Sequence, residues 1–389
     1  YPMFIALIYS LFGYKPWVVI LFQIVLDSLA SILLLFSLSQ LFSRKIALIA
    51  STFYATDPFL IFYSSTTLYS DSFFVFLLVV AFWFFSTAIS MIPQRKALIY
   101  CGLSSLFLGL ATLAKPISQY ILVLYLAYFL IVNRNRPRTA FIYSATALIV
   151  FGLMLFPWLF RNYNTFGNFS LSSSGSYNLL VLDVVPMEME RRHEDMKSVK
   201  TSLLAEADKM IEADGLNPQE LNGFQKSIYW QSLAKRYIAD DPMGFVRSYL
   251  LGMTHIFFSL DTKNFLDVFG IPSDPFEIKA YPNLIDLVKA FIKIKGITGI
   301  LIGSIILLYL CTSYVGLSVG LIVSWKLYSK PVLFLILALA LYFVVLTGPG
   351  GLARFKMPSI PFYRAFSGIG FSYLGGKISS WKNLRTGIV

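Results

Sequence analysis

The feature that most constrains this chain is a series of long apolar segments separated by short loops. A helix needs about 20 mostly apolar residues to cross a bilayer, and charged residues make up only 13% of the 389 residues. A soluble domain carries roughly 25%. We therefore expect an all-α polytopic membrane protein, a multi-helix bundle with a mainly helical insert. The predicted spans lie near 17–42, 46–64, 68–91, 97–114, 117–133, 139–160, 297–325, 331–348 and 357–375.

Basic residues occur in every second connection between these spans, and the intervening connections are nearly free of Lys and Arg. The positive-inside rule places basic loops in the cytoplasm. We therefore predict an inner- or plasma-membrane protein with nine crossings, residue 1 outside and the C-terminus in the cytoplasm. The basic positions are Arg44, Lys45, Arg95, Lys96, Arg134, Arg136, Arg138, Lys326, Lys330 and the tail residues Lys377, Lys382 and Arg385.

The acidic residues are concentrated in one hydrophilic insert. Seventeen of the twenty lie between 166 and 295, so the net charge of +12 comes from topology and does not indicate a nucleic-acid partner. We predict an N-terminal membrane module of about six spans (1–165), an extracytoplasmic loop domain (166–295) and a C-terminal module of about three spans (296–389). Within the insert, the apolar stretch 241–260 is predicted to be an in-plane helix at the outer interface.

One carboxylate and three cations are predicted at the outer ends of the spans. Asp71 begins the third span, Lys115 ends the fourth, Arg161 ends the sixth and Arg354 begins the ninth. Cations there can hold a phosphate or pyrophosphate by charge-assisted hydrogen bonds, with arginine offering a bidentate fork. A carboxylate there can act as a general base or orient an acceptor hydroxyl.

Each of these residues also has a structural interpretation. Lys115 and Arg161 could extend to the lipid headgroups, and Asp71 could cap its helix together with Ser70. Asp57 precedes Pro58 within a span and could relieve a kink.

The remaining candidates are secondary. They are Asp57, Asn162, Lys356 and His255. The two histidines, His193 and His255, are poorly placed as a pair, so we predict no metal site from them. No cofactor is assigned, and a divalent metal remains open.

Several segments together resemble the membrane-embedded GT-C glycosyltransferases that use lipid-linked sugars. The bacterial branch related to protein O-mannosyltransferases and aminoarabinose transferases (glycosyltransferase families 39 and 83) is the most similar. Each segment is degenerate, and the order and spacing of the series carry the resemblance over most of the chain. The segments are "YPMFIALIYSLFGYKPW", "RKIALIASTFYATDPFLIFYSSTTLYSDSFFVFLLVVAFWFF", "GLSSLFLGLATLAKP", "FPWLFRNYNTFGNFSLSSSGSYNLL" and "ARFKMPSIPF".

The resemblance implies transfer of a sugar from a polyprenyl or dolichyl phosphate carrier to a protein, lipid or glycan on the outer face. It implies that Asp71 matches an acidic active-site position. Lys115 would match a basic residue before Pro or Gly, Arg161 the "RN" signature and Arg354 the "R-[YF]-x-x-P" signature, with the basic groups facing the carrier phosphate. Such enzymes begin with a further span and a loop that bears the acidic residue thought to be the base. Since this sequence opens at Tyr1 where that loop would end, either the chain is a fragment or it does not catalyse transfer in the usual way.

Two other classes of function remain open. The same charges could line the path of a lipid-oligosaccharide flippase or transporter, or the chain could be a non-catalytic membrane subunit. Transporters commonly contain inverted repeats or paired broken helices, which this sequence does not show. That absence and the large outward loop favour an enzyme.

Overall fold

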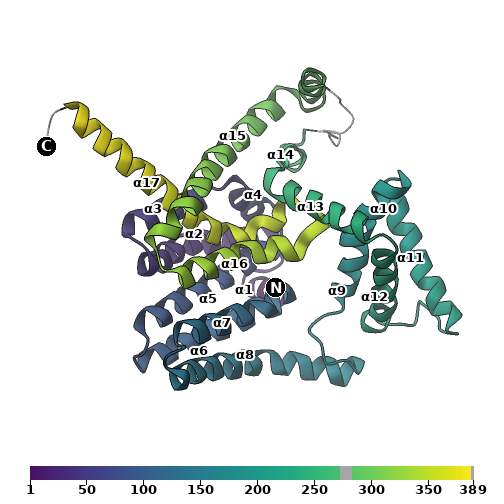
Figure 1. Ribbon diagram of the computed structural model, residues 1–389. Coiled ribbons are helices and arrows are strands. Elements are labelled where there is room, and N and C mark those ends of the chain that lie inside the picture. Colours follow the sequence, from purple (N-terminus) through teal and green to yellow (C-terminus); the bar gives the residue numbers. More distant parts are fainter. Residues whose placement is uncertain (272–282, 387–389) are drawn as a thin grey trace.

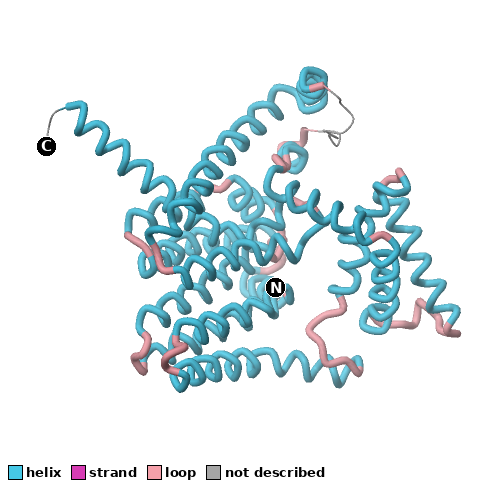
Figure 2. The backbone as a smooth tube through the Cα atoms, in the orientation of Figure 1, coloured by secondary structure: helices cyan, strands magenta, loops and turns pink. Residues whose placement is uncertain are grey.

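The computed structural model describes residues 1–271 and 283–386 and forms them almost entirely into helices. No β-strand occurs in this described part of the chain (Figure 2). The helices gather into one bundle, and a smaller helical unit stands beside it (Figure 1). The prediction of an all-α polytopic membrane fold is confirmed.

Proline and polar caps set the starts of the N-terminal helices. Proline occupies the first turn of four of the α-helices in this part, where its fixed φ suits the helix and its missing N–H is not needed. Ser43 caps another helix by accepting a hydrogen bond from the Ile46 amide. The elements are α1 (Pro2–Phe12), α2 (Pro16–Leu41), α3 (Arg44–Ala55), α4 (Pro58–Thr66), α5 (Asp71–Met91), α6 (Lys96–Ala114), the 3₁₀ helix η1 (Pro116–Tyr120), α7 (Ile121–Val132) and α8 (Pro137–Phe166).

The predicted span 46–64 is broken in its middle, where α3 and α4 meet at 47°. A residue before proline is disfavoured in the helical region, and Asp57, just before Pro58, has an extended backbone (φ −67°, ψ 118°). Its carboxylate accepts hydrogen bonds from the amides of Phe59 (3.0 Å) and Leu60 (3.4 Å). Asp57 therefore starts α4 as its N-cap.

The insert contains a helical unit with its own core. Leu180, Val199, Leu203 and Leu233 are fully buried in a cluster separate from that of the bundle, and α11 and α12 lie side by side (Figure 1). The elements of the insert are α9 (Ser174–Asn178), the π-helix η2 (Leu179–Val184), α10 (Val185–Arg192), α11 (Met196–Ala213), α12 (Gly223–Asp240), α13 (Pro242–Phe258) and α14 (Thr262–Val268).

The last helix lies at the centre of the bundle. Residues 360–370 are all buried, and this stretch belongs to the one large core that N-terminal and C-terminal helices share. Glycines permit the close crossing of α15 and α17, because a Cβ added at Gly320 would overlap the carbonyl group of Phe366. The elements are α15 (Leu284–Leu327, broken at Gly296), α16 (Lys330–Thr347), the 3₁₀ turns η4 (Gly348–Gly350) and η5 (Ala353–Ser359), and α17 (Ile360–Thr386).

Six helices within the described residues are long and apolar enough to cross a membrane, and the bent pair α3–α4 can supply a seventh crossing. The predicted spans 117–133 and 357–375 are also helical, in α7 and α17, but are not among these. The apolar stretch 241–260 forms α13, which is likewise not among them. The tail residues Lys377, Lys382 and Arg385 have side chains outside the described part.

Candidate functional site

Asp71 and Lys115 form an ion pair between the start of α5 and the end of α6. The Lys115 Nζ lies 2.6 Å from the Asp71 Oδ1, and the two side chains are 27% and 6% exposed. Pro116 forces the extended backbone of Lys115 (φ −144°, ψ 110°), which ends α6 and directs the chain away from it. Ser70 holds the N-cap position of α5 without a side-chain cap bond. The Asp71 carboxylate therefore lies in the first turn of α5, where the helix dipole favours a negative charge.

Arg354, on η5, lies over Tyr69, a residue just before α5. Its guanidinium carbon is 4.8 Å from the centre of the Tyr69 ring and 5.3 Å from that of Phe355. Tyr69 comes two residues before Asp71, and η5 packs against α5. We call Tyr69, Asp71, Lys115 and Arg354 the Asp71 site.

Arg354 has unused hydrogen-bonding capacity. Its buried Nε has no hydrogen-bond partner, and no ion pair among the described residues includes it. The planar guanidinium is thus held by aromatic faces, while its N–H groups are available. Such a group suits an anionic ligand that can accept two parallel hydrogen bonds, as phosphate does.

Arg161 lies elsewhere, near the end of α8. It is exposed, donates a hydrogen bond of 3.0 Å to the Asn162 side chain and stacks on the rings of Trp158 and Phe166. Within the described residues it makes no ion pair or hydrogen bond with the Asp71 site. Asn162 is buried and donates to the carbonyl of Ser170 at 2.8 Å, so its amide fastens the loop that follows α8.

Asp57 and Lys356 lie in the interior of the bundle. The Asp57 Oδ2 pairs with the Arg364 guanidinium at 2.5 Å, and both side chains are fully buried. The Lys356 ammonium is also buried, lies 3.3 Å from the centre of the Phe59 ring and has no hydrogen-bond partner among the described residues. The Asp57–Arg364 pair joins the α3–α4 break to α17.

A second polar group comes from the insert and was not found by sequence reasoning. The Tyr63 hydroxyl donates a hydrogen bond of 2.5 Å to Asp261, and the Asn264 amide donates one of 2.7 Å to the same carboxylate. Burial raises the pKa of the Asp261 carboxyl, and the Tyr63 hydrogen bond opposes that rise. His255 lies nearby on α13, with its Nδ1 2.5 Å from the Gly351 carbonyl oxygen.

Asp183, on the π-helix of the insert, is a further acidic residue that the sequence reasoning did not select. Burial raises its pKa from the ordinary 3.8 to about 7. π-Helical turns are rare and frequently occur at functional sites. A sequence signal existed, because Asp183 interrupts the apolar run "LLVLDVV".

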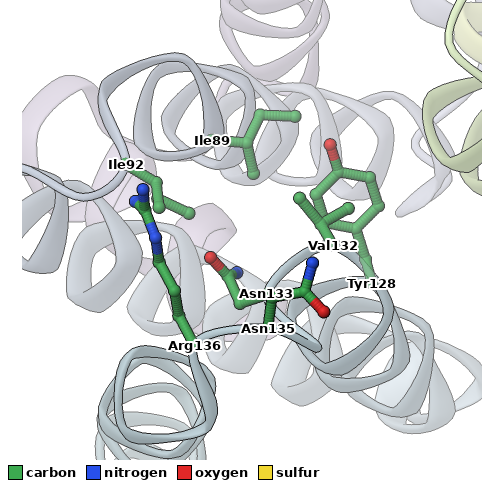
Figure 3. A pocket seen from close by; sticks show the side chains of 7 residues that line it. All are labelled: Ile89, Ile92, Tyr128, Val132, Asn133, Asn135 and Arg136. Atoms are coloured by element: carbon green, nitrogen blue, oxygen red, sulfur yellow. The ribbon is translucent and has the colours of Figure 1, made fainter.

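A cavity of about 310 Å³ lies at the other end of the bundle (Figure 3). It is bounded by the end of α5, the end of α7 and the loop before α8, whereas Asp71 begins α5. None of the predicted site residues lines it. Its lining residues are Ile89, Ile92, Tyr128, Val132, Asn133, Asn135 and Arg136.

No group of three or more His, Cys, Asp or Glu side chains is arranged to hold a metal ion within the described residues. His255 and His193 lie on or beside different helices, α13 and α10.

Comparison with protein families identifies the N-terminal part of the chain. Residues 1–160 match the family model for dolichyl-phosphate-mannose-protein mannosyltransferase. The resemblance to GT-C type membrane glycosyltransferases is confirmed. The matched range contains Asp71 and Lys115 and ends just before Arg161. No curated protein matches the chain.

Two solved structures of an oligosaccharyltransferase from Archaeoglobus fulgidus are similar to the chain. One, AglB in complex with an inhibitory peptide and a dolichol-phosphate, is 15% identical with a TM-score of 0.48, and the match covers 94% of this chain and 40% of that one. The other, tethered to an acceptor peptide containing the NVT sequon, is 14% identical with a TM-score of 0.50 over 95% and 39%. The second match supports the same GT-C membrane fold. The chain spans about 40% of the length of these enzymes.

Proposed function

We propose that this chain is a membrane glycosyltransferase that moves a sugar from a polyprenyl- or dolichyl-phosphate carrier to an acceptor. The observation that carries this proposal is the Arg354 guanidinium, which has no carboxylate partner among the described residues and lies over Tyr69, two residues before Asp71 of the Asp71–Lys115 pair. The match of residues 1–160 to the mannosyltransferase family supports the reaction class. The acceptor is a protein, lipid or glycan.

The reaction breaks the bond between the sugar C1 and the phosphate oxygen and forms a bond from C1 to the acceptor. The leaving group is the lipid phosphate, which keeps the electron pair of the broken bond. Arg354 binds its oxygens through a bidentate fork, and Lys115 adds a second positive charge. Preorganised cations of this kind stabilise the negative charge that develops on the leaving oxygen.

Asp71 acts on the other partner of the reaction in this proposal. A carboxylate at the reacting centre can orient the acceptor or receive its proton, and it can offset positive charge that develops at C1. The ion pair with Lys115 fixes the position of the Asp71 carboxylate. The same lysine therefore orients the carboxylate and faces the phosphate.

Binding of the carrier tests the role of Arg354 without requiring the acceptor. Arg354→Ala should weaken binding of a polyprenyl-phosphate analogue by about 1.5–3 kcal/mol, the cost of one charge-assisted contact. Arg354→Lys keeps the charge but loses the fork, so it should lose less. Arg161→Ala serves as the comparison, because that arginine also stacks on aromatic rings but does not contact the Asp71 site. Equal binding by wild type and Arg354→Ala would reject the phosphate role of Arg354. An equal loss of binding in Arg161→Ala would show that Arg161 also contributes to the phosphate site.

We further propose that the Asp71 site faces the outside of the cell. α5 begins at Asp71, and its other end leads into the basic Arg95–Lys96 connection, which the positive-inside rule assigns to the cytoplasm. The insert and the Asp71 site then share the outer side. Ser174→Cys should react with an impermeant thiol reagent in intact cells and Asn135→Cys should not. Both need Cys311→Ser, because Cys311 is exposed whereas Cys101 is buried. Labelling of Asn135→Cys but not of Ser174→Cys would show that the topology is the reverse of the one proposed.

A further inference from the structure

Asp261 has a left-handed backbone conformation. Its φ is 51° and its ψ is 25°, in the left-handed region, which residues other than glycine adopt at a cost. It precedes α14 without capping that helix through its side chain. Its carboxylate instead accepts the hydrogen bonds from Tyr63 and Asn264. This backbone conformation directs the carboxylate toward Tyr63 on α4, which is 198 residues away from Asp261 in the sequence.

A continuous series of contacts leads from Asp261 to Arg354. The Tyr63 side chain is buried, and its ring centre lies 6.4 Å from that of Tyr69. Tyr69 is in turn the ring over which the Arg354 guanidinium lies, at 4.8 Å. Asp261 therefore holds the hydroxyl of the first ring of a two-ring wall that supports Arg354.

The same segment contacts the loop before Arg354 at a second point. His255 Nδ1 faces the Gly351 carbonyl oxygen at 2.5 Å, and because a carbonyl only accepts, this nitrogen carries the hydrogen. Gly351 has φ +56° and lies three residues before Arg354. The end of α13 and the start of α14 thus hold the surroundings of Arg354 from two directions.

We propose that Asp261 is a positioning residue of the Asp71 site, which acts through Tyr63 and Tyr69 to hold Arg354 where the carrier phosphate binds. The inference rests on the proposed function and assigns to the insert a part in forming the phosphate site. Asp261 needs no negative charge for this role. It needs only an oxygen that accepts the Tyr63 hydrogen bond.

The test compares four single variants and one double variant, Asp261→Ala with Tyr63→Phe, of the full-length protein for sugar transfer from a polyprenyl-phosphate donor, with KM and kcat measured separately. Asp261→Ala removes the acceptor, Tyr63→Phe removes the donor and Asp261→Asn keeps an acceptor oxygen. Asp267→Ala is the matched control, because Asp267 lies on α14, the helix that follows Asp261, but is exposed and pairs only with Lys263 among the described residues. Thermal unfolding of each variant shows whether it is folded.

The account predicts that Asp261→Ala and Tyr63→Phe each raise KM for the donor by up to about tenfold, the effect of one lost hydrogen bond. Their combination should raise it no further, since both remove the same contact. Asp261→Asn should restore KM to near the wild-type value, and Asp267→Ala should match wild type. Binding of a polyprenyl-phosphate analogue should follow KM.

Three results would overturn the inference. In the first, Asp261→Asn loses kcat as severely as Asp261→Ala at unchanged KM. That result would mean that the negative charge of Asp261 acts directly on the reacting atoms. In the second, the effects of Asp261→Ala and Tyr63→Phe add fully. In the third, both variants match a wild type that transfers sugar, so the proposed function stands without the positioning role. A wild type that transfers no sugar overturns the proposed function and this inference together.

Discussion

At the scale of single residues, burial separates two ion pairs that look alike in the sequence. The Lys115 side chain is 27% exposed although its partner Asp71 is buried, whereas Asp57 and Arg364 are both completely buried. A buried pair contributes little net stability compared with apolar residues of similar size, but removing one partner leaves an uncompensated charge. We therefore expect a mainly structural role for Asp57–Arg364.

The buried pair gives a direct stability prediction. Arg364→Ala should lower the free energy of unfolding by about 3–5 kcal/mol, because Asp57 is left buried without its partner. The double variant Asp57→Asn, Arg364→Met should lose clearly less, since asparagine still caps α4 and methionine fills the space. Denaturant unfolding in detergent measures both. A double variant as unstable as Arg364→Ala would show that the charge pair itself stabilises the fold.

Asp183 predicts a pH-dependent stability. Because burial raises its folded-state pKa from 3.8 to about 7, its contribution to stability is full below about pH 4 and is lost as the pH rises through about 7. Asp183→Asn should thus raise the free energy of unfolding by roughly 2–4 kcal/mol at pH 8 and leave it unchanged near pH 4. Asp195→Asn is the control, because Asp195 is an exposed N-cap that asparagine can replace. Parallel pH profiles of wild type and Asp183→Asn would contradict this account.

Some of these residues could be selected from the sequence and others could not. Asp71 and Lys115 stood out because charges at the ends of apolar segments are costly and therefore informative. The same rule applied to Arg364, inside "PSIPFYRAFSG", but the prediction did not select it, and its pairing with Asp57 is visible only in the structure. Asp261 carried no such signal, because it lies in a polar loop and its importance comes from a contact with Tyr63 that only the tertiary fold creates.

At the scale of elements, a close helix crossing depends on glycines whose spacing can be recognised in the sequence. Gly316 and Gly320 form a G-x-x-x-G pattern on α15 and face Phe371 and Phe366 of α17. Small residues with this spacing let two helix backbones approach in a membrane. Here the spacing brings α15 against the fully buried first part of α17.

This crossing yields a test with a matched control. Gly320→Ala should destabilise the bundle by about 1–3 kcal/mol, the usual cost of overpacking, because the added methyl meets the backbone of Phe366. Gly152→Ala adds the same methyl to α8 where nothing lies within 4 Å, so it should be neutral or slightly stabilising. Thermal unfolding in detergent compares the two. Equal unfolding midpoints for wild type and Gly320→Ala would show that α15 and α17 can move apart to accept the methyl group without a loss of stability.

At the scale of the whole molecule, composition was enough to predict the fold class, and the apolar segments located the helices. The sequence did not predict the number of long spans so well. Asp57 and Pro58 bend the predicted span 46–64 into α3 and α4, which can still supply one crossing, and α7 is a short helix preceded by a 3₁₀ turn. Hydropathy averages over such breaks, and only the local backbone geometry reveals them.

The central claim is that Asp71, Lys115 and Arg354 form the site of sugar transfer. The most direct measurement is transfer of a labelled sugar from a polyprenyl-phosphate donor by the full-length protein in detergent, wild type against Asp71→Asn. Asparagine keeps the shape of the side chain and removes its charge. The account predicts that transfer falls about 100-fold, as expected for a lost acid–base contribution, while folding and carrier binding persist. Transfer by Asp71→Asn within about threefold of wild type, well short of that contribution, would contradict the claim.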